Sequence, residues 1–368
     1  MNFQSGKIDK WFLIISAMLV VAGFFIFSSA SLGILASNQG KFSSVAFNQL
    51  FLGLFLGLLA CLVFSKIDYH VWRKYSFVIF LATIVLTLMV FVPAIGFQHG
   101  GAKRWLDFGF VSFQPSELLK IGYIVYLAAW ISKKRDKMQS FKGGLLPFLI
   151  MSGIVGIVLL TQPDTDTYLV IMVAGVAMYL SGGGKWSHML AVGLIGIVGL
   201  VSIALTRPYI KERIMTFVNP RENTLTSGYQ IRQSLIAVGS GQMFGRGFGK
   251  SIQKFSYLPE PIGDSIFAVA AEEFGFIGAT ILILIFLLFS LRGLKIASES
   301  KDMFGGLLTV GIVIIITCQM FVNIGGMIGL LPLTGIPLPF ISHGGTALFI
   351  TLVETGIILN ISNKSKRT

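Results

Sequence analysis

Ten apolar segments recur along the 368-residue chain and constrain its fold more than any other feature. They lie at residues 11–30, 45–64, 76–95, 117–132, 145–160, 166–181, 187–205, 266–291, 304–331 and 343–362. Because a helix of roughly 20 apolar residues crosses a lipid bilayer, the pattern predicts an all-α integral membrane protein with ten transmembrane helices. We expect a single polytopic membrane domain over residues 1–368.

Composition supports this class and excludes others. Of the residues, 54% are hydrophobic and only 12% are charged, about half the charged share of a typical globular domain. A water-soluble fold has no interior large enough for so much apolar surface. The net charge of +13 does not indicate nucleic-acid binding, because the basic residues lie between the apolar segments and not on one polar face. A cytosolic enzyme, a disordered chain and a nucleic-acid partner are therefore excluded.

The distribution of Lys and Arg predicts the orientation in the membrane. Cytoplasmic loops of membrane proteins are enriched in these residues. With the N-terminus inside, the inner connections at 66–74, 133–142 and 292–301 are rich in Lys and Arg, whereas the short outer loops hold few, such as Lys103 and Arg104. Both termini are therefore expected to be cytoplasmic.

One connection is far longer than the others. Residues 206–265, between the seventh and eighth predicted helices, form an outer loop with more basic than acidic residues. Long loops are usually functional, and a basic loop at an outer membrane surface suits a phosphate-bearing or anionic-lipid ligand. The alternative is a solvated connector that lies against lipid headgroups.

Charged residues within or beside the apolar segments are candidate functional residues, because an unpaired charge in hydrocarbon is costly. The most informative group is Arg104, Gln114, Glu117 and Lys120. Pro115 predicts a helix start, which puts Glu117 in the first turn and Lys120 three residues later on the same face. This pair either lines a polar cavity that opens outward or braces the helix bundle.

Other acids have plainer explanations. Asp164 and Asp166 stand where the sixth predicted helix begins, and acids at a helix start are more often caps than catalysts. Of Glu272 and Glu273, in the eighth predicted helix, one is expected to face the interior. Glu354 is isolated in the tenth helix, and the sequence names no partner for it.

Asp264 is the strongest single candidate. It falls in the motif Tyr-Leu-Pro-Glu-Pro-Ile-Gly-Asp-Ser at 257–265, where the long loop re-enters the membrane. A carboxylate at the mouth of an apolar bundle is partly desolvated, which raises its pKa and suits it to general-base catalysis. The alternative is that Asp264 is the N-cap of the eighth helix.

The last outer connection, residues 332–346, is rich in Pro and Gly. Its backbone cannot be regular helix, so it must be buried in protein or line a wet cavity. Its amides, with Ser342 and Thr346, suit a diphosphate or a sugar, and a rigid re-entrant turn without a ligand is the alternative. The two Cys and four His are scattered without metal-ligand spacing, so no protein metal site is predicted.

These motifs together resemble the SEDS family (shape, elongation, division and sporulation), the FtsW and RodA proteins of bacteria. The resemblance spans nearly the whole chain. It rests on Gly-Ala-Lys-Arg-Trp at 101–105, Gln-Pro-Ser-Glu-Leu-Leu-Lys at 114–120, Gln-Pro-Asp at 162–164, Tyr-Gln-Ile-Arg-Gln-Ser at 229–234, Gly-Arg-Gly-Phe-Gly at 245–249, and the motifs at 258–267, 272–278 and 337–342.

The resemblance implies a SEDS-type helix bundle whose large extracytoplasmic loop lies between helices 7 and 8. It also implies a peptidoglycan glycosyltransferase of the bacterial cytoplasmic membrane, which polymerises lipid II onto a nascent glycan strand. The family's essential loop aspartate matches Asp264, its membrane Glu and Lys match Glu117 and Lys120, and its Arg before Trp matches Arg104. The further candidate substrate-binding residues are Gln114, Asp164, Gln230, Arg232, Gln233, Arg246, Ser342 and His343.

The resemblance also bears on cofactors and partners. It implies no fixed cofactor, although a divalent cation, Mg²⁺ or Mn²⁺, can accompany the lipid diphosphate. The expected protein partner is a class B penicillin-binding protein, a transpeptidase, together with other membrane proteins of division or elongation.

The chain departs from the family pattern at four positions. Asp166 stands in place of a typical Gly, His343 of a Tyr and Thr346 of a Ser, and Glu354 is atypical for the tenth helix. The Asp264 region is intact and is closer to the division-type FtsW branch than to the elongation type. The alternative function is a lipid II flippase, and a non-catalytic scaffold is a third. Against transport, the candidate groups cluster at the outer boundary and not at the bilayer midplane.

Overall fold

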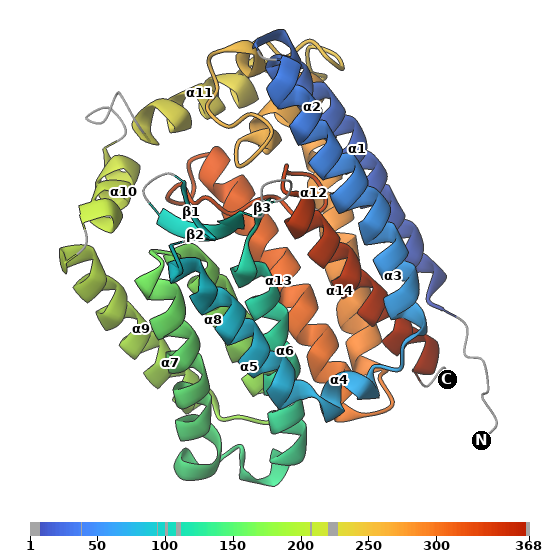
Figure 1. Ribbon diagram of the computed structural model, residues 1–368, viewed down its shortest axis with the longest axis vertical. Helices are drawn as coiled ribbons and strands as arrows, with labels where there is room; N and C mark the ends of the chain where they lie inside the picture. Colours follow the sequence, from blue (N-terminus) through green and yellow to red (C-terminus); the bar gives the residue numbers. More distant parts are fainter. Residues whose placement is uncertain are drawn as a thin grey trace.

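The computed structural model describes residues 8–37, 39–93, 95–99, 102–107, 112–206, 208–219 and 227–365, and most of them are helical (Figure 1). The first half of the chain contains α1 (Lys10–Ser37), α2 (Gln39–Phe47), η1 (Asn48–Phe55), α3 (Leu56–Lys66), α4 (His70–Lys74), α5 (Ser76–Leu88), η2 (Met89–Phe91), α6 (Pro115–Lys133), η3 (Arg135–Lys137), η4 (Phe141–Leu145), α7 (Leu146–Thr161) and α8 (Thr165–Ser181). The second half contains α9 (Trp186–Thr206), α10 (Pro208–Val218), α11 (Ser227–Ser240), η5 (Gln253–Phe255), α12 (Ile266–Ser298), α13 (Met303–Met327) and α14 (Gly345–Lys364).

The ten predicted apolar segments lie mainly in helices, which confirms the prediction of a helical membrane fold. Six helical stretches of the described chain are long and apolar enough to cross a membrane: Lys10–Ala36, Phe42–Lys66, Phe141–Thr161, Ile266–Ser298, Met303–Met327 and Gly345–Lys364. Shorter apolar helices at Ser76–Phe91, Thr165–Ser181 and Trp186–Gly199 coincide with three further predicted segments. The remaining one is α6, which carries Glu117 and Lys120 in its first turns.

The helices pack around α13. This helix contacts α6, α8 and α12, while α1 packs along α12, and α3 packs along α14. The fully buried apolar side chains include Leu119, Ile124, Phe286 and Phe304, and polar and charged side chains are buried among them. The start of α1 and the end of α14 lie at the same end of the bundle, because the Asp9 amide donates to Ser362 Oγ at 3.2 Å.

A small antiparallel sheet departs from the all-α prediction. Strands β1 (Gly96–His99), β2 (Ala102–Asp107) and β3 (Ser112–Phe113) follow η2 in the order β1-β2-β3. Residue pairs such as Phe97 with Trp105 set its register. The sheet was not expected because its strands are only two to six residues long. It covers one end of the helices, above α5, α6 and α8 (Figure 1).

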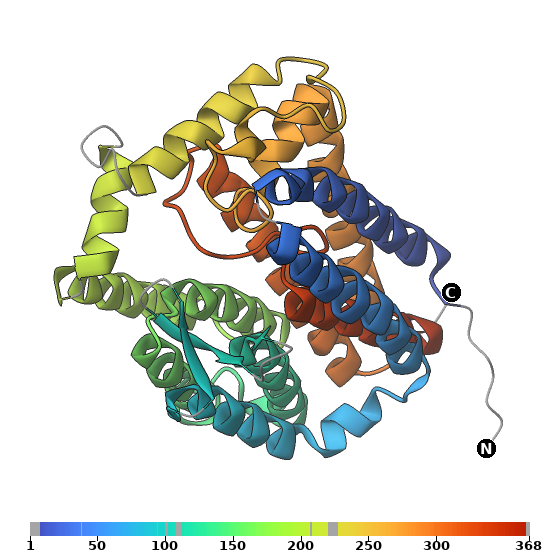
Figure 2. The same cartoon turned by 45° about the horizontal axis from the view of Figure 1, so that its top comes forward.

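The connection at 206–265, which was expected to be a long outer loop, contains α10, α11 and η5. Residues 207 and 220–226 of this segment lie outside the described residues. Figure 2 shows α9, α10 and α11 following one another around the edge of the molecule, with α11 next to the start of α12. The connection therefore reaches from the side of α8 to the side of α1.

The Pro/Gly-rich connection between α13 and α14 is non-helical and largely buried, as predicted. Leu333, Ile336, Leu338 and Phe340 are all buried, so this backbone lies within protein. The following helix α14 begins after Gly344, whose φ of 159° is open to glycine and unfavourable for other residues.

Candidate active site

A polar cleft lies where the first turns of α6 and α8 meet strand β2, α13 and the connection before α14. Its interior volume is small, about 20 Å³, and it opens to solvent. Its lining residues are Arg104, Gln114, Glu117, Lys120, Asp164, Asp166, Thr167, Val170, Gln319, Gly335, Ile336 and Pro337. The fold thus brings together five predicted site residues, Arg104, Gln114, Glu117, Lys120 and Asp164, from three separate motifs.

Glu117 and Lys120 form a buried ion pair in the wall of this cleft. Lys120 Nζ lies 2.8 Å from Glu117 Oε2, and their side chains are only 3% and 5% exposed. The predicted shared helix face is therefore confirmed. Pro115 opens α6, so Glu117 lies in the first turn, where the helix dipole favours a carboxylate.

Arg104 is fixed by the turn between α7 and α8. Its Nε donates to the carbonyl of Gln162 at 3.3 Å, and a terminal nitrogen donates to the carbonyl of Pro163. Its other terminal nitrogen lies 3.7 Å from Asp164 Oδ1. Strand β2 thus presents a rigid cation at the cleft, with the guanidinium held in one orientation.

Asp164 occupies the N-cap position of α8, but its side chain makes no capping bond to the helix amides. The interpretation of Asp164 as a capping side chain is therefore wrong. Its carboxylate is buried, and Oδ2 has no hydrogen-bond partner. Burial raises the pKa of the Asp164 carboxyl above its ordinary value, while the charge of Arg104 opposes that rise.

Asp264 lies on the turn before α12, at the edge of this cleft. Its backbone carbonyl accepts a hydrogen bond from Asn323 Nδ2 of α13 at 2.9 Å. A Cβ atom built on Gly335, which lines the cleft, would lie 3.6 Å from Asp264 Oδ2. The N-cap of α12 is Ser265, so the alternative in which Asp264 caps this helix is wrong.

The Asp264 carboxylate has an unusual electrostatic environment. Within the described chain, no basic side chain lies within ion-pair distance of it. Burial raises its pKa to about 7, and repulsion from Glu260 adds to that rise, whereas Arg213 and Arg104 act against it. A carboxylate with this pKa is ionised at slightly alkaline pH and is then a stronger base than an ordinary Asp.

Several other predicted site residues surround the Asp264 turn. Gln230 of α11 donates to Ser265 Oγ at 3.0 Å. Ser342 donates its hydroxyl to the carbonyl of Gly263 at 2.8 Å, and the amide of His343 donates to the carbonyl of Ile262 at 2.7 Å. These groups hold the turn from two sides.

The remaining predicted residues are more distant. Arg232 is exposed on α11, and Gln233 is half-buried on the same helix. Arg246 is not part of the cleft lining but pairs with Glu272, with Nε 3.3 Å from Oε1. Both Glu272 and Glu273 are buried, whereas only one was expected to face the interior.

Three residues near the site were not among the predicted ones. Gln319 of α13 lines the cleft, and Asn323, one turn later, also donates to the carbonyl of Ile336 at 2.9 Å. Arg213 of α10 pairs with Asp166. A signal for the first two was available, because two amides four residues apart in an apolar helix share a face and are costly in hydrocarbon.

The donor groups of the cleft do not fit a resident metal ion. Its acids are Glu117, Asp164 and Asp166, and each is paired with a cationic side chain. In the part of the chain that the structure describes, no three His, Cys, Asp or Glu side chains gather in a metal-binding group. A cation at this site would have to bring its own ligands.

Comparisons with known proteins match nearly the full length of the chain. The family model FtsW/RodA/SpoVE, described as cell cycle protein, matches residues 9–367. The stage V sporulation protein E of Bacillus subtilis (strain 168) is 37% identical over 370 residues and covers 100% of both chains. A probable peptidoglycan glycosyltransferase FtsW of Geobacter sp. (strain M18) is 39% identical over 311 residues, covering 84% of this chain and 85% of its own.

Solved structures are similar as well. The rod shape determining protein RodA of Thermus thermophilus superposes with a TM-score of 0.72 at 25% identity and covers 100% of both chains. A chain of a peptidoglycan synthase complex, studied for the coordination of polymerization and crosslinking, has a TM-score of 0.79 at 25% identity and covers 98% of this chain and 99% of its own. On the family model and the identity of these relatives, the chain belongs to the FtsW/RodA/SpoVE family.

Proposed function

We propose that this protein is a peptidoglycan glycosyltransferase that polymerises lipid II, with Asp264 as its general base. The observation that carries the proposal is the state of the Asp264 carboxylate. It is not a lining residue of the cleft but lies at its edge, beside the lining residue Gly335. It does not cap α12, has no ion-pair partner in the described chain and has a pKa raised to about 7. The curated relatives named peptidoglycan glycosyltransferase support the reaction class.

The proposed reaction joins two lipid-linked saccharides. Asp264 takes the proton from the 4-hydroxyl of the acceptor N-acetylglucosamine, and that oxygen forms a bond to the anomeric carbon of the donor N-acetylmuramic acid. The bond from this carbon to the diphosphate breaks with inversion, and undecaprenyl diphosphate leaves with the bonding electrons. The proton rests on Asp264 until solvent removes it.

Negative charge develops on the departing diphosphate, so cations should be fixed near it before the reaction. Arg104 and Lys120 line the cleft, and each is held by an acid partner, Asp164 and Glu117. Their partners fix the orientation of the cations and leave further donor hydrogens for the diphosphate. A divalent cation would arrive with the diphosphate as part of the substrate.

The topology follows from the same proposal. The ten apolar segments span the bacterial cytoplasmic membrane, both termini are cytoplasmic, and the cleft, the sheet and the connection 206–265 lie on the outer side.

A class B penicillin-binding protein is the proposed partner, supported by the similarity to a chain from a peptidoglycan synthase complex. The similarity to relatives named FtsW supports a role in division.

The test is polymerisation of labelled lipid II by purified protein, with and without the transpeptidase partner. Asp264→Asn should form no glycan polymer, and the matched variant Glu299→Gln, an acid at the far end of α12, should polymerise as the unmodified protein does. Polymer formed by Asp264→Asn would refute the general-base assignment. Movement of labelled lipid II across a vesicle without polymer would refute the transferase in favour of a flippase.

A further inference from the structure

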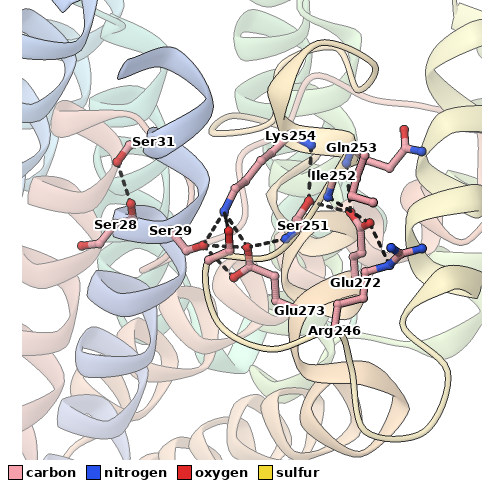
Figure 3. A network of polar contacts seen from close by, with 11 residues as sticks. Ser28, Ser29, Ser31, Arg246, Ser251, Ile252, Gln253, Lys254, Glu272 and Glu273 are labelled. Carbon is pink, nitrogen blue, oxygen red and sulfur yellow. Dashed lines mark hydrogen bonds and ion pairs between the residues drawn. The ribbon is translucent and has the colours of Figure 1, made fainter. Parts of the chain in front are cut away.

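Lys254 and Glu273 form a buried ion pair that closes the segment carrying Asp264. Lys254 stands ten residues before Asp264 and Glu273 nine residues after it in the sequence. Lys254 Nζ lies 2.7 Å from Glu273 Oε1, and the side chains are 0% and 1% exposed (Figure 3). The two ends of this segment are therefore joined by opposite charges inside the protein.

Ser29 of α1 is the third member of this contact. Its hydroxyl lies 2.7 and 2.6 Å from the two carboxylate oxygens of Glu273, and Lys254 Nζ approaches the same hydroxyl at 2.9 Å. Lys254 Nζ also donates to the carbonyl of Gly249 at 2.9 Å. On α1, a Cβ atom at Gly33 would lie 2.2 Å from the carbonyl oxygen of Lys254, so glycine lets the segment lie directly on the helix.

Glu272 binds the residues that directly precede this segment. Its carboxylate accepts hydrogen bonds from Ser251 Oγ at 2.5 Å and from the amides of Ile252 and Gln253 at 3.2 and 3.3 Å. Arg246 approaches its Oε1 from the other side (Figure 3). Two consecutive acids of α12 thus bind residues 246–254 by charge-assisted contacts, which are stronger than neutral ones.

Helix α12 is interrupted where these contacts are made. Gly275 has φ of 68° within the helix, and the backbone of the incoming loop inserts there. The amide of Phe276 donates to the carbonyl of Gln242 at 2.8 Å, and a Cβ at Gly245 would lie 2.1 Å from the carbonyl of Glu273. The Lys254–Glu273 pair is therefore built into a kink that needs glycine on both segments, Gly245 in the loop and Gly275 in α12.

A buried ion pair contributes little net folding stability, because both charges lose their hydration when they are buried. The segment that it closes also contains a strained residue: Glu260 has φ of 46°, and its carbonyl accepts the amides of Gly263 and Ser265 at 3.1 and 3.2 Å. Backbone of this kind persists when surrounding structure determines it. Asn323 holds the segment at Asp264 itself, and the ion pair joins its two ends.

We propose that Lys254 and Glu273, with Ser29, are positioning residues that close residues 254–273 into a rigid loop and so set the place of the Asp264 carboxylate at the cleft. This inference rests on the proposed function for its consequence in catalysis. The pair lies outside the cleft lining and acts through the backbone between it and Asp264.

The test compares two charge-removing double variants. Lys254→Met with Glu273→Gln removes the closing pair without leaving a lone buried charge, which would threaten folding. Asp9→Asn with Arg292→Gln is the control, because this ion pair (2.6 Å) also involves α12 but joins it to the residue before α1, at the end of α12 away from Glu273. Ser29→Ala is a milder variant of the closing contact.

We expect kcat of the Lys254/Glu273 double variant to fall about 100-fold, as misplacement of a catalytic group by about 1 Å can do. The KM of the double variant should stay near that of the unmodified protein. The kcat of Ser29→Ala should lie between those of the double variant and the unmodified protein, and the kcat of the Asp9/Arg292 control should be unchanged. The acidic limb of the pH–rate profile should also move to lower pH. A freed Asp264 gains water, which lowers its pKa, because burial is the main cause of the rise. The charged groups around it stay in place: Glu260, Asp166, Arg213 and Arg104. An unchanged limb, with activity falling only in proportion to folded protein, would overturn the proposal.

Hydrogen–deuterium exchange supplies a readout that needs no activity. Amides of residues 255–265 should exchange faster in the Lys254/Glu273 variant and not in the Asp9/Arg292 control, measured on the intact protein in detergent. Unchanged exchange in this segment would overturn the closing role whatever the enzyme assay shows. If the unmodified protein makes no polymer while the exchange result holds, the proposed function fails and the positioning of Asp264 stands.

Discussion

Arg213 of α10 lies 2.5 Å from the carboxylate of Asp166 at the start of α8. The contact ties the long connection between α9 and α12 to the wall of the cleft. Asp166 is one of the positions at which the chain departs from the SEDS pattern, where Gly is typical. The departure therefore introduces a tether that glycine could not provide.

Asp166→Asn should loosen α10. Both side chains of the pair are partly exposed, so its loss should cost about 1 kcal/mol at most and lower the thermal unfolding temperature slightly. Amides of α10 should exchange faster with solvent, while those of α13 should not change. Exchange of α10 at the original rate in Asp166→Asn would show that other contacts hold this helix and that the tether is unimportant.

The pH dependence of polymerisation should follow the raised pKa of Asp264. The general base must be ionised, so kcat/KM should rise with pH and level off above a pKa of about 7. Glu260→Gln removes a negative charge that raises this pKa, so the acidic limb should move to lower pH. A limb near pH 4 in the unmodified protein would contradict the environment assigned to Asp264.

Folding stability should depend on the same pKa of Asp264, but it should fall with rising pH, whereas activity rises. The native state holds a proton on Asp264 up to about pH 7, whereas the unfolded chain releases it near the ordinary value of 3.8. Between these values the native state binds more protons, so ionisation costs stability as the pH rises. Asp264→Asn should therefore unfold at a higher temperature than the unmodified protein at pH 8, and the gain should vanish near pH 4. An equal gain at both pH values would contradict this linkage.

The sequence predicted the helical membrane class and five of the residues that line the cleft, for physical reasons that can be stated. Long apolar segments have one stable form in a bilayer, and a Pro followed by Glu and Lys three apart fixes a helix start and a shared face. Glu117 and Lys120 form the ion pair that this spacing predicts. The short strands around Arg104 and the helices within 206–265 were not predicted, because they depend on contacts between distant segments and not on local periodicity.

The cap interpretations of Asp164 and Asp264 failed for a related reason. Both residues have the right type and position for capping, but local sequence does not report where a side chain turns once tertiary contacts form. Arg104 competes for Asp164, and Asn323 fixes the backbone at Asp264. The Lys254–Glu273 contact could not be predicted either, since it depends on a helix kink at Gly275.

Removing the charge of one member of the Glu117–Lys120 pair should lower the folding stability more than removing both charges. Lys120→Met leaves Glu117 charged in a site where it is only 5% exposed, at a cost of about 3–5 kcal/mol. Lys120→Met with Glu117→Gln should recover most of that stability but should not recover polymerisation, because the cation that faces the diphosphate is absent. Thermal unfolding and polymer assays of the same preparations test both parts, and an active double variant would reduce the pair to a bracing role.

Gly335 offers a direct test of whether substrate approaches the Asp264 carboxylate through the cleft. A methyl group there would lie 3.6 Å from Asp264 Oδ2, an ordinary contact distance, so Gly335→Ala should fold normally. The methyl would nevertheless occupy space that the acceptor sugar needs, and kcat/KM should fall about tenfold or more. Gly153→Ala is the control, because a Cβ there meets nothing within 4 Å and the site is inside α7; it should leave activity unchanged. Equal activity of the two variants would mean that the acceptor reaches Asp264 from another side.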